Sequence, residues 1–190
     1  GTPAKPRNLS IDLSKGKYIM FIDGDDWLPE DALEKLYTLL KTNKTDYATG
    51  LTKYVHSDRI ARSGVALSKI AYNKVDLKHF RKSFYHLAPA GRMIKASVIK
   101  KNHIQFPEMI FGEDLQFFAE VFFNTKRIST TQDVVYCANR YDDNISLVKS
   151  EKSTHINRMK WQGEAYRHLM SKYKNNKLMP NLLYRIINKD

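Results

Sequence analysis

One short segment constrains this chain more than any other: an apolar run that ends abruptly in an acidic turn. Residues 18–22 read Tyr-Ile-Met-Phe-Ile, a composition typical of a strand buried on both faces. The sequence Asp23-Gly24-Asp25-Asp26 follows at once. A proline and two acidic residues at positions 29–31 then predict the first turn of a helix, where both are favoured.

Strands and helices are expected to alternate along the rest of the chain. We predict helices over residues 3–15, 28–41, 96–102 and 113–124, strands over 18–22, 47–54, 91–95, 127–130 and 134–138, and a loop or irregular hairpin over 56–73. The chain after residue 151 is predicted to be helical, with a break around 174–180. This alternation predicts an α/β domain with a mostly parallel central sheet, in which ligands bind beyond the carboxyl ends of the strands.

The acidic turn lies at such a strand end and predicts a metal site. Its carboxylates repel one another unless a cation or solvent separates them. Hard cations such as Mg²⁺ or Mn²⁺ prefer carboxylate oxygens, and a diphosphate can supply further ligands. We therefore predict that Asp23 and Asp25 hold a divalent metal that neutralises a departing diphosphate. The alternative is a solvated turn in which Asp26 caps the next helix.

A second acidic pair, Glu113 and Asp114, begins the most apolar helix of the chain. One interpretation is a helix cap, because free amides at a helix start stabilise a carboxylate. The other is a general base. Displacement at an anomeric carbon needs a group that accepts the proton of the incoming hydroxyl, a problem that glycosidases solve with paired acids.

Three motifs occur in one order: Pro6-Arg7-Asn8, residues 14–18 (Ser-Lys-Gly-Lys-Tyr) and residues 21–28 (Phe-Ile-Asp-Gly-Asp-Asp-Trp-Leu). Together they resemble the inverting GT-A glycosyltransferases of the large family-two group, which have a Rossmann-like α/β fold and use nucleotide diphosphate sugars. The resemblance implies that Asp25 ligates the metal, with Asp23 close by. It also places Arg7 and Asn8 on the nucleotide side of the donor.

The resemblance extends to the other side of the site. It implies that Asp114 is the general base with Glu113 as its neighbour, and that Gly91 and Arg92 line the acceptor side. Arg140 would contact the diphosphate, although an ordinary polar turn is an equal alternative there. Relatives often carry a metal-binding His in the loop after the last strand. This sequence has Asp142 and Asp143 there instead.

Residues 5–8, 106–108 and 113–117 look most like the wall-teichoic-acid glycosyltransferases of Gram-positive bacteria. The resemblance implies a UDP-sugar donor such as UDP-GlcNAc and an anionic glycopolymer or lipid-linked saccharide as acceptor. Such a polyanion, rather than nucleic acid, would explain the net charge of +12. The alternatives from other classes are a non-catalytic sugar-nucleotide-binding module and a polyanion-binding protein.

The resemblance also sets the expected organisation of the chain. Residues 1–150 correspond to the later part of a GT-A catalytic domain, with the metal, donor and acceptor sites, and residues 151–190 form a helical C-terminal segment. Because the nucleotide-binding strand-helix-strand segment of that family is absent from this sequence, we expect the 190 residues alone to bind donor poorly and to be inactive. The C-terminal helices either pack back on the domain or mediate homo-oligomerisation.

Cysteine content and hydropathy exclude some other classes. Cys137 is the single cysteine, so a disulfide framework and a cysteine metal site are excluded. No apolar run is long enough to span a bilayer, and no secretory signal opens the sequence. We therefore expect a cytoplasmic protein, with peripheral association at the inner face of the plasma membrane as an option.

Overall fold

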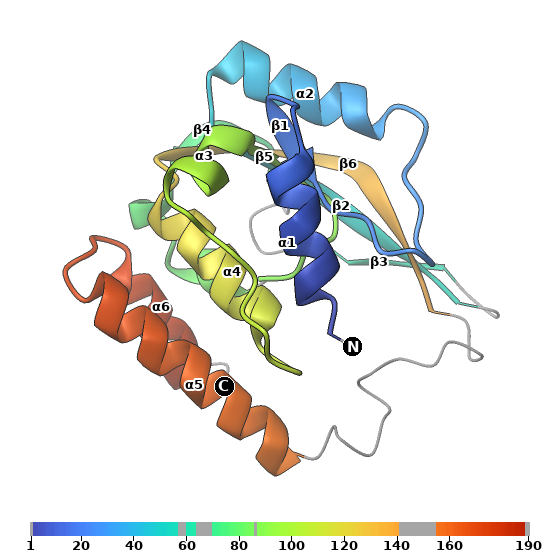
Figure 1. Ribbon diagram of the computed structural model, residues 1–190. Coiled ribbons are helices and arrows are strands. Elements are labelled where there is room, and N and C mark those ends of the chain that lie inside the picture. The colour runs from blue at the N-terminus through green and yellow to red at the C-terminus, as the bar shows by residue number, and fades with distance from the viewer. Residues whose placement is uncertain (1, 57–59, 64–69, 86, 141–154, 189–190) are drawn as a thin grey trace.

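The computed structural model describes residues 2–56, 60–63, 70–85, 87–140 and 155–188, and its layers are visible in Figure 1. The helices are α1 (Ala4–Leu13), α2 (Ala32–Asn43), α3 (Ala96–Lys101), α4 (Glu113–Phe123), α5 (His155–Tyr173) and α6 (Met179–Asn188). The strands are β1 (Tyr18–Met20), β2 (Tyr47–Val55), β3 (Ile60–Ser63), β4 (Tyr72–Asp76), β5 (Arg92–Lys95) and β6 (Arg127–Asn139). Two short 3-10 helices, η2 (Leu77–His79) and η3 (Arg81–Tyr85), lie between β4 and β5.

The strands form one sheet in the order β1-β5-β2-β6-β4, with β3 paired to β2. The prediction of a mostly parallel sheet is wrong: among the described strands only β2 and β6 pair in parallel. The periodicity of a strand carries no information about its direction, and β5 runs antiparallel between β1 and β2. Strands β1, β2 and β6 nevertheless point the same way, so the carboxyl ends of β1 and β6 lie at one edge of the sheet.

The two strands expected between residues 127 and 138 are a single strand, β6, whose pairing with β2 shifts register near Leu51. Gly50 explains how β2 accommodates this irregularity. A Cβ at that position would lie 2.8 Å from the carbonyl oxygen of Asp133 and from a methyl group of Val135. Strand β4 was not predicted: its first two residues fall at the end of the stretch interpreted as a loop or irregular hairpin, and no element was predicted for the residues that follow.

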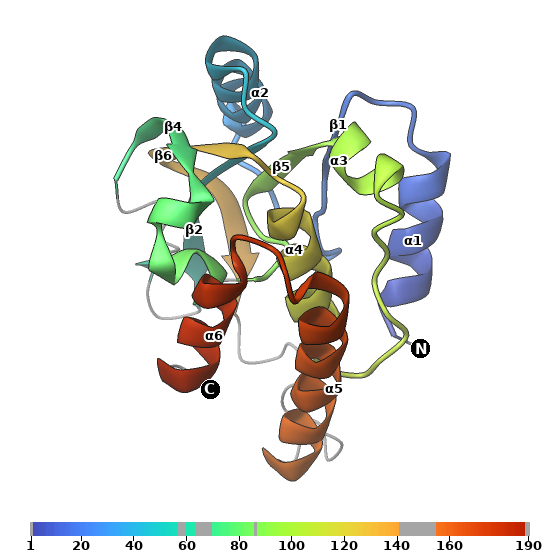
Figure 2. The same cartoon turned by 90° about the vertical axis from the view of Figure 1, so that its left-hand side faces the viewer.

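Helices cover both faces of the sheet (Figures 1 and 2). On one face Leu36 and Leu40 of α2 are buried against the sheet, whereas Leu33 and Tyr37 of the same helix are 52% and 43% exposed. The other face carries α1, α3 and α4 and the main core. As predicted, β1 is covered on both faces: Ile19 faces the main core and its two neighbours face α2.

The C-terminal helices pack back on the domain, as one of the two interpretations expected. Ala165 and Leu169 of α5 and Leu182 of α6 are fully buried and belong to the same core as α4. Figure 2 shows α5 beside α4, on the side away from the sheet, and α6 packs against η3. No helix among the described residues combines the length and apolarity that a bilayer crossing requires.

A buried carboxylate fastens α5 to α4. Glu120 of α4 is 3% exposed and accepts hydrogen bonds from Lys172 Nζ at 2.6 Å and from Tyr173 Oη at 3.0 Å. His168 Nε2 lies 2.9 Å from the same carboxylate. The apolar pattern of α4 predicts the helix but does not single out Glu120.

Replacing Glu120 with alanine is expected to lower the free energy of unfolding by about 1–3 kcal/mol, because three polar partners lose their buried acceptor. Urea unfolding followed by circular dichroism measures the change. The matched control is Glu34→Ala on the exposed side of α2, which should change stability by less than about 0.5 kcal/mol. Equal effects of the two substitutions would contradict the role given to Glu120.

Candidate active site

The acidic turn after β1 is anchored to the end of β6. Trp27 N donates to the carbonyl of Cys137 at 3.0 Å, and Cys137 N donates to the carbonyl of Trp27 at 2.8 Å. These reciprocal backbone bonds fix the turn at the carboxyl end of two strands that run in the same direction. The position predicted for a ligand site in an α/β sheet is therefore where the turn lies.

The three carboxylates of this turn have different surroundings. Asp26 accepts from Tyr136 Oη at 2.7 Å and from the backbone N–H of Asn139 at 2.8 Å. Tyr136 Oη also accepts from the backbone N–H of Asp23 at 3.1 Å. Asp25 is exposed. Asp26 therefore holds the turn to β6, and the alternative in which it caps α2 is wrong, since Asp31 is the residue that precedes that helix.

Tyr136 and Asn139 were missed by sequence analysis. Tyr136 is fully buried in the middle of an apolar strand, and Asn139 acts through its backbone N–H. A buried tyrosine usually finds a partner for its hydroxyl, but the sequence does not say which one. No local pattern could have assigned either residue to the acidic turn.

Arg7 joins the two acidic sites. Its Nη2 lies 2.8 Å from Asp23 Oδ1 and its Nη1 lies 2.8 Å from Asp114 Oδ1. The guanidinium is also 5.1 Å from the centre of the Phe106 ring, and only 14% of the Arg7 side chain is exposed. The carboxylate predicted as metal ligand and the carboxylate predicted as base thus share one cation, although 107 residues separate Arg7 from Asp114.

Asn8 orients the helix that carries Arg7. Its side-chain amide donates to the carbonyl of Phe106 at 2.8 Å and accepts from the N–H of the same residue at 2.8 Å. In this arrangement both functions of the amide are used within the protein. Contact of Arg7 and Asn8 with a nucleotide stays a prediction.

The surroundings of Glu113 and Asp114 favour a base over a cap. Helix α4 starts after Gly112, which has no side chain that could cap the helix and whose φ of 89° is a left-handed conformation that favours glycine. Burial raises the pKa of Asp114 to about 6, with Arg7 acting in the opposite direction. Burial and the neighbouring Asp114 raise the pKa of Glu113 to about 7. A carboxylate with a pKa close to neutral is suited to proton transfer.

These raised pKa values predict a pH-dependent stability. The native protein binds more protons than the unfolded chain between about pH 4 and pH 7, so the free energy of unfolding should fall as the pH rises through this interval. We expect Asp114→Asn to be more stable than the unmodified protein at pH 7, by about 1–3 kcal/mol, and the difference to narrow near pH 4.

Urea unfolding at several pH values measures this difference. Asp12→Asn, at an exposed position of α1, is the control and should change the free energy of unfolding by less than about 0.5 kcal/mol. If Asp114→Asn were less stable than the unmodified protein at pH 7, the contact with Arg7 would stabilise the ionised Asp114 by more than burial destabilises it, and the prediction would be wrong.

The residues predicted for the acceptor side are buried. Arg92 is 2% exposed, and its guanidinium lies 5.1 Å from the centre of the Phe118 ring. Its positive charge helps to lower the pKa of Asp114. Gly91 has a φ of 70°, and a Cβ there would lie 3.3 Å from Val135 Cγ2. Their contact with an acceptor therefore stays a prediction, and the structure gives Arg92 an electrostatic role beside Asp114.

Arg140 lies at the end of β6, the edge of the sheet that carries the acidic turn. It is exposed, its Nη1 donates to the carbonyl of Asn139 at 2.9 Å, and its guanidinium lies 5.1 Å from the Tyr54 ring centre. Asp142 and Asp143 fall outside the described residues.

The donor set of the turn fits a metal that is shared with a substrate. Within the described part of the chain, no group of three or more His, Cys, Asp or Glu side chains is placed to hold an ion. Asp23 and Asp25 offer two carboxylates, and one oxygen of Asp23 already contacts Arg7. Magnesium commonly binds proteins through one or two carboxylates and takes its remaining ligands from phosphate and water. The residues present match that arrangement.

An α/β domain with acidic residues beyond the carboxyl end of β1 and a second acidic pair at the start of α4 defines the GT-A class of fold. The family model described as "Glycosyl transferase family 2" matches residues 2–102 of the chain. The chain belongs to this family.

Several curated relatives are similar in sequence. A poly(ribitol-phosphate) beta-glucosyltransferase of Bacillus spizizenii is 34% identical over 72% of this chain and 21% of its own length. The poly(ribitol-phosphate) beta-N-acetylglucosaminyltransferase TarP of Staphylococcus aureus is 31% identical over 87% of this chain and 48% of its own length. The chain thus spans between about a fifth and a half of these relatives.

Solved structures show the same fold. A crystal structure of S. aureus TarS 1-349 superposes with a TM-score of 0.74 at 22% identity, covering 100% of this chain and 52% of that one. TarS 1-349 in complex with UDP-GlcNAc gives a TM-score of 0.70 at 22% identity, over 92% of this chain and 55% of that one.

Proposed function

We propose that this chain is the metal- and acceptor-binding part of an inverting glycosyltransferase, which transfers a sugar from a UDP-sugar to a hydroxyl group of poly(ribitol phosphate). The observation that carries the proposal is the cluster in which Arg7 contacts both Asp23 and Asp114 at 2.8 Å. It brings the acidic turn and the candidate base into one site. The printed activities of the relatives from Bacillus and Staphylococcus support the choice of acceptor.

In the proposed reaction Asp114 accepts the proton of the acceptor hydroxyl while that oxygen forms a bond to the anomeric carbon of the donor sugar. The bond from this carbon to the diphosphate breaks, and its electron pair leaves with UDP. A single displacement inverts the anomeric configuration. A divalent cation, Mn²⁺ or Mg²⁺, held by Asp25 and Asp23 would supply positive charge to the diphosphate.

Arg7 has a supporting role in this mechanism. Its positive charge holds Asp114 in place and opposes the rise in the pKa of Asp114 that burial causes. Asp114 therefore remains able to act as a base near neutral pH rather than being protonated throughout. The neighbouring Glu113 has a pKa of about 7 and is therefore partly protonated near neutral pH.

The test is an assay of the full-length protein with UDP-GlcNAc, poly(ribitol phosphate) and Mn²⁺ or Mg²⁺. We expect release of UDP that depends on acceptor and metal, and a β-linked product by NMR. Transfer from UDP-glucose alone would keep the function and change the donor, which is an open choice because the relatives differ in this sugar. An α-linked product, or metal-independent transfer, would contradict the mechanism.

A polyanion-binding protein without catalysis is the competing function, favoured by the net charge of +12. It would bind the polymer equally well with Asp25 or Asp114 replaced, and it would release no UDP. The assay above separates the two.

A further inference from the structure

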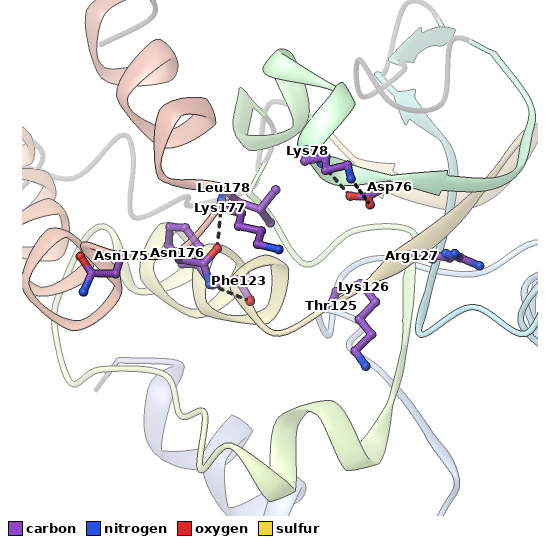
Figure 3. Close-up of a pocket in the computed structure, with 10 residues that line it drawn as sticks. All are labelled: Asp76, Lys78, Phe123, Thr125, Lys126, Arg127, Asn175, Asn176, Lys177 and Leu178. Atoms are coloured by element: carbon purple, nitrogen blue, oxygen red, sulfur yellow. Dashed lines mark hydrogen bonds and ion pairs between the residues drawn. The ribbon is translucent and has the colours of Figure 1, made fainter.

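A pocket that lies away from the candidate active site is lined by basic side chains. It has a volume of about 550 Å³ and lies where the start of β6, the end of β4 and the α5–α6 turn meet (Figure 3). Asp76, at the end of β4, pairs in register with Arg127, the first residue of β6. The acidic turn is at the other end of β6, so the length of this strand separates the two places.

The pocket combines an apolar wall with cations. Phe123 and Leu178 are each 7% exposed and contribute apolar surface, whereas Lys126, Arg127 and Lys177 are exposed side chains. In Figure 3 Lys177 extends over the pocket from the α5–α6 turn. No carboxylate of the described residues lies within ion-pair distance of these three cations. Their charges are therefore available to an anionic ligand.

The backbone around the pocket is held in place. Asn176 Nδ2 donates to the carbonyl of Phe123 at 3.1 Å, and Asn176 Oδ1 accepts from the N–H of Leu178 at 2.9 Å. These bonds, drawn in Figure 3, tie the turn that carries Lys177 to the end of α4. On the facing side Lys78 is 3.5 Å from Asp76, which partly neutralises a fourth cation. The pocket lining therefore has a net positive charge, and hydrogen bonds hold the backbone that carries it.

We propose that this pocket binds a phosphodiester group of the acceptor polymer at a repeat distant from the one being glycosylated. The choice of polymer rests on the proposed function. A chain of repeating phosphates can occupy the pocket and the active site together, and the second contact then benefits from a high effective concentration. An anionic membrane is the less favoured partner, because the large exposed hydrophobic side chains of the described residues are not among those that line the pocket.

The experiment measures binding of fluorescently labelled poly(ribitol phosphate) to the full-length protein, by anisotropy and without donor. Substituting Lys126→Gln, Arg127→Gln and Lys177→Gln together should weaken binding by about tenfold or more at low salt and make the dependence of affinity on salt less steep. Far-ultraviolet circular dichroism and thermal unfolding establish that the variant is folded.

The control removes the same number of charges elsewhere: Lys15→Gln, Lys101→Gln and Lys160→Gln, all at exposed positions outside the pocket. If the two triple variants lose polymer affinity equally, the basic surface acts as a whole and the pocket proposal is wrong. If the pocket variant loses binding to phosphatidylglycerol vesicles but keeps its affinity for the polymer, the pocket is a membrane contact and the proposal is also wrong.

The two proposals can fail separately. Absence of sugar transfer in the full-length protein would remove the proposed function, whereas polymer binding without donor is measured independently of turnover. With an active full-length protein, the pocket variant should show a raised KM for long polymer and unchanged kinetics with an acceptor of one repeat. An unchanged KM for long polymer would overturn the pocket proposal and leave the active site untouched.

Discussion

Asparagine in place of Asp114 is expected to lower the kcat of sugar transfer by about 10²- to 10⁴-fold, the usual contribution of a general base. The amide is close in shape to the carboxylate and can still accept the hydrogen bond from Arg7, but it cannot take the proton of the acceptor. Donor binding should change little, because the acidic turn is not altered. The measurement is steady-state kinetics of the full-length protein, with donor affinity determined by calorimetry.

The pH profile provides an independent check on Asp114. In the unmodified protein kcat/KM should rise with pH through an apparent pKa of about 6, because the base must be ionised. The residual activity of Asp114→Asn should lose this step. Asp12→Asn on exposed α1 is the matched control and should keep both rate and profile. Full activity of Asp114→Asn would assign the base to another group.

Asparagine in place of Asp25 is expected to weaken metal-dependent binding of the UDP-sugar by at least about tenfold, since an exposed carboxylate that can reach a substrate-shared metal is lost. Calorimetric titration of the donor with and without Mn²⁺ measures the effect. Adding a chelator to the unmodified protein should reproduce it.

Glu30→Gln is the control for Asp25, because Glu30 is an exposed acid a few residues further along the chain. It should leave donor affinity unchanged at every metal concentration. A metal at this turn would be contradicted if the donor bound with the same affinity to Asp25→Asn, to the unmodified protein with chelator and to the unmodified protein with Mn²⁺.

The two acidic sites could be found from sequence because each depends on local pattern. An apolar run followed by Asp23-Gly24-Asp25 places carboxylates at a strand end, and a long apolar helix that begins with Glu113 and Asp114 places a second pair at its start. The structure contains both elements where the pattern predicts them. Hydrophobic periodicity is a property of residues that are close together in the chain, so it can be recognised from the sequence.

Other features depend on contacts between residues far apart in the chain. The direction of β5 and the burial of Arg92 follow from how the elements assemble, and neither leaves a local pattern. The contact of the Arg92 side chain with Phe118 leaves no local pattern either, and its contact with an acceptor stays a prediction.

The sequence by itself determined the α/β class and the two acidic motifs, because periodicity and short-range spacing encode them, and the resemblance of its motifs to known glycosyltransferases indicated the family. Only the tertiary structure decided which carboxylate of the turn is exposed, that Tyr136 holds the turn, and that Arg7 lies between Asp23 and Asp114. The physical reason is that charge pairing and burial depend on distance in space, and residues separated by a hundred positions meet only once the chain has folded.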